Sequence, residues 1–74
     1  MSNSHSEDYK RIGRKIAYYR NIKGLTQQQL ADEVGISLSY LGKIESPNTF
    51  KSFSLDVLWD IADALDLDIV NLLK

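Results

Sequence analysis

Four small or basic residues recur at helical spacing in the stretch LADEVGISLSYLGKIES, and three of them carry side chains that can donate hydrogen bonds. They are Ser39, Gly42, Lys43 and Ser46, with Leu38 beside them. At 100° per residue these positions share one side of a helix. Two hydroxyls and an ammonium group can donate to anionic oxygens or to polar ring atoms. The pattern therefore indicates a recognition surface.

The sequence offers no catalytic constellation. His5 is the only histidine, and it lies in the polar segment 1–7, which we predict to be a disordered tail. There is no cysteine, which excludes disulfides and thiolate metal sites, and no Gly-rich phosphate loop. The five aspartates of residues 52–74 are spaced as a solvated face. We therefore expect a protein that is not an enzyme and that uses neither a cofactor nor a metal.

Length and composition limit the chain to one globular domain, which we place at residues 8–74. Hydrophobic residues make up 43% of the chain and charged residues 26%, as in ordinary folded domains. No apolar run reaches the roughly 18 residues of a membrane span, and the start, MSNSHSEDYK, lacks the apolar centre of a secretion signal. With no cysteine present, these features favour a cytoplasmic protein without a membrane partner.

Charge is divided unevenly along the chain. Residues 1–51 carry a net charge of +3 and residues 52–74 carry −4, which together give the overall −1. One face could therefore meet phosphate while another stays acidic, although an ordinary solvated surface is the alternative interpretation.

Apolar periodicity predicts five helices and no sheet, so the expected fold class is all-α. The expected helices occupy residues 8–23, 27–34, 38–45 and 55–65 and a short stretch after Asp68. Thr26, Ser37 and Ser54 have the side chains of helix N-caps. Leu55, Leu58, Ala62 and Leu65 are expected on the core face of the fourth helix, with Trp59 and Ile61 widening it.

Gly35 separates two helices that are each too short to be stable alone. A glycine turn of this kind supplies a positive φ and lets two helices meet at a sharp angle. Apolar residues on the inner side would hold the second helix in place and leave its outer face free. A short helix with a small, polar, mildly basic outer face fits the major groove of duplex DNA, which is about 12 Å wide.

The run GLTQQQLADEVGISLSYLGKIE, residues 24–45, resembles the helix-turn-helix of phage-repressor and Cro-like transcriptional regulators. The elements that match are Gly24 to Gln27, Leu30-Ala31, Gly35, Ser37, Tyr40-Leu41 and Ile44-Glu45. The flanking helices also fit the compact five-helix, lambda-repressor-like domain of that family. The resemblance implies a sequence-specific regulator of transcription that binds double-stranded DNA.

The resemblance also implies roles for individual residues. Gln27 would touch a phosphate, and Ser37, Leu38, Ser39 and Lys43 would face the bases. Tyr40 would pack at the domain edge with its hydroxyl within reach of phosphate. Arg20 and Glu45 match a structural salt bridge of the family. For Leu38, Ser39 and Lys43, a simple exposed surface remains the alternative interpretation.

The loop after Glu45 departs from the family pattern. It reads SPNTFKSFS, without the usual glycine and with one basic residue. We assign the phosphate contacts of this loop to Asn48, Thr49 and Lys51, and we expect Phe50 and Phe53 to anchor it to the core.

A single short helix reads too few base pairs for high affinity, so we expect a homodimer on an inverted repeat. The candidate dimer surface on the last two helices consists of Val57, Ile61, Ala64, Ile69, Val70 and Leu73. Repression is the expected mode of regulation. The alternatives are a protein-interaction module, such as an antitoxin or an adaptor with a partner protein, and a restriction–modification controller protein.

Overall fold

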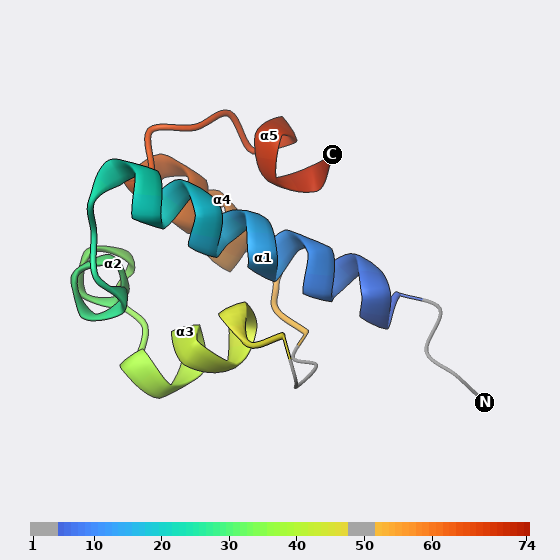
Figure 1. Ribbon diagram of the computed structural model, residues 1–74, viewed down its shortest axis with the longest axis horizontal. Helices are drawn as coiled ribbons and strands as arrows, with labels where there is room; N and C mark the ends of the chain where they lie inside the picture. The colour runs from blue at the N-terminus through green and yellow to red at the C-terminus, as the bar shows by residue number, and fades with distance from the viewer. Residues whose placement is uncertain (1–4, 48–51) are drawn as a thin grey trace.

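The structure is a computed structural model that describes residues 5–47 and 52–74 (Figure 1). These residues form five helices and no strand: α1 (Ser6–Lys23), α2 (Gln27–Val34), α3 (Leu38–Glu45), α4 (Leu55–Ala64) and α5 (Val70–Leu73). The all-α, five-helix prediction is confirmed. None of these helices is long and apolar enough to cross a bilayer. Three residues predicted to contact phosphate, Asn48, Thr49 and Lys51, lie outside the described part of the chain, as does Phe50.

Helix α1 begins at Ser6, two residues earlier than the sequence predicts, so that residues 6 and 7 are helical. His5 precedes it without a side-chain capping bond, and Glu7 and Asp8 occupy the first turn. Acidic side chains there interact favourably with the positive end of the helix dipole. The helix ends at Gly24, whose φ of 79° is a left-handed value that glycine adopts without strain.

Hydroxyl side chains begin the next three helices as predicted. Oγ1 of Thr26 accepts the N–H of Gln29 at 3.0 Å, and the Gln29 side chain accepts the N–H of Thr26 at 2.8 Å, which completes a capping box. Ser37 and Ser54 cap α3 and α4 through one bond each, as their Oγ atoms accept the N–H groups of Tyr40 at 3.0 Å and Val57 at 3.2 Å. Gly35 closes α2 with φ 84°, so the sharp turn before α3 forms at the predicted residue.

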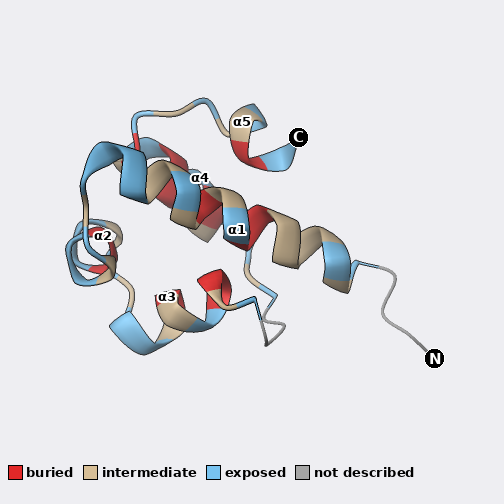
Figure 2. Cartoon of the chain, viewed as in Figure 1, coloured by how far each residue is buried: buried red, intermediate tan, exposed pale blue. Residues whose placement is uncertain are grey.

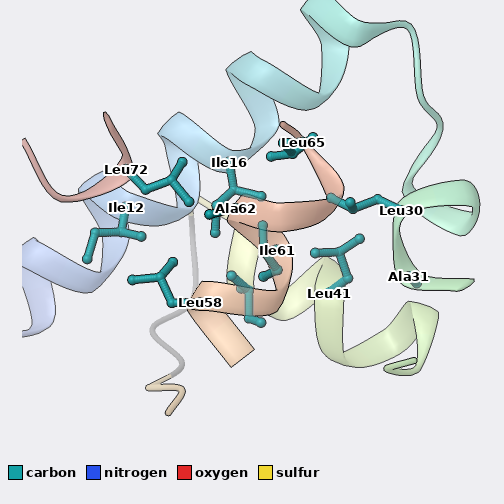
Figure 3. Packing of buried hydrophobic residues seen from close by; sticks show 11 residues of the cluster. Ile12, Ile16, Leu30, Ala31, Leu41, Leu58, Ile61, Ala62, Leu65 and Leu72 are labelled. Carbon is teal, nitrogen blue, oxygen red and sulfur yellow. The ribbon is translucent and has the colours of Figure 1, made fainter. Parts of the chain in front are cut away.

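The core lies between α1, α4 and the inner faces of the helix-turn-helix (Figures 2 and 3). Its buried members are Ile12, Ile16, Leu30, Ala31, Leu41, Ile44, Leu58, Ile61, Ala62, Leu65 and Leu72. The predicted core face of α4 is wrong at one margin, because Leu55 is 53% exposed and Trp59 is 49% exposed. Helix α4 packs against α2, and Ile61 is fully buried in the core, where the sequence analysis expects it to widen the core face of α4.

Helices α1 and α3 approach each other through a glycine. A β-carbon added at Gly13 would collide with the main-chain carbonyl oxygen of Ile44, at the end of α3. Gly13 is itself buried. No side chain therefore fits between the two helices at this point, and the backbone of α3 lies directly on α1.

Candidate nucleic-acid interface

The outer face of α3 is open to solvent. Ser37, Leu38, Ser39 and Lys43 are exposed, Leu38 to 43%, while Leu41 and Ile44 on the inner face are buried. Figure 2 shows the buried turns of α3 facing the rest of the domain and its exposed residues facing away from it. The structure thus gathers the four residues predicted to face DNA bases on one exposed surface.

Tyr40 lies at the edge of that surface. Its side chain is half-buried and packs against the core cluster. This is the position at the domain edge that the sequence predicts for its ring.

A buried ion pair holds the carboxyl end of α3. Nε of Arg20 in α1 lies 2.9 Å from Oε2 of Glu45, and a second guanidinium nitrogen lies 3.0 Å from Oε1. The Glu45 side chain is 4% exposed and that of Arg20 is 12% exposed. Arg20 also donates to the Leu25 carbonyl at 2.8 Å. A fork of donors on one buried carboxylate is the geometry in which arginine pairs most strongly.

Gln27 joins this pair from the first turn of α2. Its Nε2 donates to Oε1 of Glu45 at 3.0 Å. One carboxylate therefore links α1, α2 and α3, and we call Arg20, Gln27 and Glu45 the polar hub. The family resemblance pairs Arg20 with Glu45 but does not indicate the third member. No local pattern signals it, since Gln27 and Glu45 are 18 positions apart.

The amide nitrogen of Gln27 is thus engaged inside the protein. The start of α2 still has donors for an anion, because the first N–H groups of a helix have no acceptor within it. Thr26 satisfies the N–H of Gln29 through its side chain and that of Leu30 through its carbonyl. The N–H groups of Gln27 and Gln28 come before these two, at the end of the helix where anions are favoured.

Lys43 provides positive charge on this surface. It forms no ion pair with any residue of segments 5–47 and 52–74, so its ammonium group is available to an external anion. Within the same segments, no group of three acidic or histidine side chains could hold a metal ion. The chemistry of this surface is hydrogen bonding and charge attraction.

The predicted dimer residues fall into three classes of exposure. Val70 and Leu73 are exposed, to 46% and 42%, while Val57, Ala64 and Ile69 are half-buried. Ile61 has no exposed surface, so its prediction as an interface residue is wrong. The physical reason is that Ile61 belongs to the hydrophobic core cluster inside the domain.

Comparison with known proteins identifies the family. A family model described as helix-turn-helix, HTH_3, matches residues 16–72. The chain is 42% identical over 55 residues to the HTH-type transcriptional regulator YazB of Bacillus subtilis, covering 74% of this chain and 77% of YazB.

Solved structures of similar fold support the same assignment. The restriction-modification controller protein C.AhdI from Aeromonas hydrophila has a TM-score of 0.81 and 32% identity, over 89% of this chain and 97% of its own. SinR, a master regulator for biofilm formation solved in complex with DNA, has a TM-score of 0.78 and 35% identity. The match covers 85% of this chain and 98% of the SinR chain. The structure of SinR in complex with the SinI protein matches with a TM-score of 0.77 and 35% identity. This match covers 85% of this chain and 60% of the solved chain.

The turn at Gly35 and the outward-facing α3 agree with the family model, which matches most of the chain. The chain belongs to the HTH_3, Cro-like family of helix-turn-helix transcriptional regulators, which are DNA-binding proteins and not enzymes.

Proposed function

We propose that the protein represses transcription by binding an inverted-repeat operator as a homodimer, with α3 in the major groove of each half-site. Leu38, Ser39 and Lys43 read base edges, and Ser37 borders them at the start of the helix. The N–H groups at the start of α2 contact a phosphate, with Gln27 holding that turn in place through the polar hub.

The exposure of the outer face of α3 is the observation that carries this proposal. Leu38, Ser39 and Lys43 are exposed, whereas the opposite face of the same eight-residue helix is buried. A helix held by its inner face and polar outside has the form of a groove-reading element. The likeness to SinR, which has been solved with DNA, supports the same interpretation.

The homodimer is proposed on energetic grounds and on exposed apolar surface. One α3 contacts four or five base pairs, which is too few for the roughly 10⁻⁸–10⁻¹¹ M affinity of specific regulators. Val70 and Leu73 are the exposed members of the predicted dimer surface, and Leu55 and Trp59 add apolar area on α4. Burial of side chains of this size supplies the driving force for association.

Selection of bound duplexes from a random DNA pool tests the proposal. Two-fold symmetric sequences with half-site centres about 34 Å apart are the expected product. Lys43→Ala should then lower affinity for the selected site by roughly five- to a hundredfold and affinity for random DNA by much less.

Lys10→Ala is the matched control, because Lys10 lies on α1 and pairs with Glu7 at 3.7 Å. It should leave the preference for the selected site unchanged. Recovery of no enriched sequence, or equal losses for the two variants on selected and random DNA, would refute the assignment of α3 as the reading helix. A reporter gene placed behind the selected site distinguishes repression from activation.

A second candidate is a restriction–modification controller, a narrower form of the same function. The observation that favours it is the match to C.AhdI over 97% of that protein's chain. A selected site upstream of a restriction gene in the source genome would support it.

A protein-interaction role is the third candidate, and the likeness to SinR in complex with SinI favours it. A partner protein that co-purifies in a fixed ratio, with no enrichment of DNA from the random pool, would support this role in place of the first.

A further inference from the structure

The face of α1 that turns away from α3 is basic and aromatic. It forms a shallow depression of about 360 Å³, lined by Arg11, Arg14, Lys15, Tyr18 and Tyr19. Tyr18 is 61% exposed, and its ring meets that of Tyr19 edge-on at 5.1 Å. Gly13, which abuts α3, lies roughly on the opposite side of the helix. This basic face therefore points away from DNA bound by α3.

Two cations of the basic face have no internal partner. Arg11 donates to Asp8 at 3.1 Å and to the Leu73 carbonyl at 3.2 Å. Arg14 and Lys15, in contrast, form no ion pair with any residue in the described part of the chain. Both charges lie outside the surface that we propose to contact DNA.

An acidic stripe on α4 complements them. Asp56, Asp60 and Asp63 are exposed at positions i, i+4 and i+7, and they too are without an ion pair among residues 5–47 and 52–74. The stripe borders a second depression, of about 440 Å³, lined by Glu33, Val34, Asp60, Asp63 and Ala64. Seven residues of helix rise about 10.5 Å, which is also the length of the stretch from Arg11 to Tyr18 on α1.

We propose that the basic face of α1 in one copy packs against the acidic stripe of α4 in the next copy. The protein is its own best partner, because both unpaired charge sets are carried by one chain whose net charge is only −1. Copies can therefore approach without long-range repulsion. Arg14 and Lys15 would meet Asp60 and Asp63, while Tyr18 supplies apolar contact area beside them.

This contact joins two different surfaces, so it does not close on itself as a two-fold dimer does. It can add one copy after another and so connect neighbouring dimers in a row. Because it uses neither α3 nor the start of α2, it is independent of the proposed DNA contacts. Its failure would leave the proposed function standing, and self-association can be measured without DNA.

Sedimentation velocity of the full chain at two salt concentrations tests the proposal. Near 0.05 M salt, the average mass should rise with protein concentration above the mass seen near 1 M salt, where charges are screened within about 3 Å. Arg14→Glu combined with Lys15→Glu should weaken this low-salt association about tenfold, and Asp60→Lys with Asp63→Lys should do the same.

Mixing the two double variants provides the decisive measurement. An acidic α1 face on one variant then meets a basic α4 stripe on the other, so low-salt association should return while each variant alone lacks it. Lys10→Glu with Lys74→Glu is the matched control, since it makes the same change in net charge at other positions and should leave association intact. The proposal is overturned if the parent chain keeps one mass at both salt concentrations, if the mixture fails to associate, or if the control behaves like the Arg14 and Lys15 variant.

Discussion

The two sides of α1 meet their neighbouring helices by different means. On the α3 side, Gly13 allows backbone contact, and the polar hub buries a charged pair in which donors from Arg20 and Gln27 converge on Glu45. On the α5 side, Arg11 donates one hydrogen bond of 3.2 Å to a carbonyl, and Leu73 keeps 42% of its surface exposed.

This difference follows from what each helix must present to its surroundings. Helix α3 has eight residues and only two buried apolar side chains, because its outer face has to stay polar. The polar contacts of Glu45 therefore hold the carboxyl end of α3 against α1 and α2, in addition to its small buried apolar surface. Helix α5 keeps exposed apolar surface, which is what an interface with another copy needs.

Removing the carboxylate of the hub should have the largest effect. Glu45→Ala leaves Arg20 buried without its partner and should lower the free energy of unfolding by about 3–5 kcal/mol, measured by urea denaturation. Lys23→Ala is the control, since Lys23 pairs with Asp66 at 3.3 Å on the surface and its loss should cost less than about 1 kcal/mol. Equal costs for the two variants would mean that the hub does not distinguish the α3 side.

A methyl group added at Gly13, where α1 touches α3, should cause the second-largest loss of stability. Gly13→Ala forces the β-carbon against the Ile44 carbonyl and should destabilise the fold by about 3 kcal/mol, even though alanine favours helices. Thermal unfolding measures the loss. Gly42→Ala is the matched control on α3, where a β-carbon would meet nothing within 4 Å, and it should be neutral or stabilising.

Charges on the α5 side should break the dimer and spare the fold. Val70→Asp with Leu73→Asp should weaken dimerisation about a hundredfold, because two apolar side chains at the proposed interface become charged. Analytical ultracentrifugation gives the dissociation constant, and circular dichroism reports the retained helix. If the variant dimerises like the parent, the interface does not include Val70 and Leu73. Leu55 and Trp59 would then be the next residues to change.

Loss of a helix cap should have the smallest effect on the free energy of unfolding, and two caps can be compared. Thr26→Ala and Ser54→Ala each remove one capping bond and should each cost about 1 kcal/mol in unfolding experiments. Only the Thr26 variant adjoins Gln27 and the polar hub, so only this variant should also weaken DNA binding. Equal DNA affinity for both variants would contradict the proposal that the start of α2 contacts a phosphate.

Local chemistry made most of the fold predictable from the sequence. Caps at Thr26, Ser37 and Ser54 and the left-handed glycine at Gly35 depend on neighbours in the chain, and all four are where the sequence places them. The outward face of α3 followed from the same helical periodicity.

Features that depend on distant elements could not be predicted in this way. The exposure of Leu55 and Trp59 depends on where the other helices pack around α4. A glycine inside a helix, such as Gly13, reveals its close contact only when α3 is placed beside it. The bond of Gln27 to Glu45 has the same origin, since three helices must assemble before the two side chains meet.

The attachment of α3 at one end has a mechanical consequence. Gly13 and Arg20, two turns apart on α1, contact the adjacent residues Ile44 and Glu45. The last turn of α3 is therefore held at two points, which restricts its movement relative to α1. In the proposed homodimer, an operator whose half-site spacing differs from the spacing of the two α3 helices would have to bend or twist to fit. The stiffness of bases that the protein does not touch would then contribute to its selectivity.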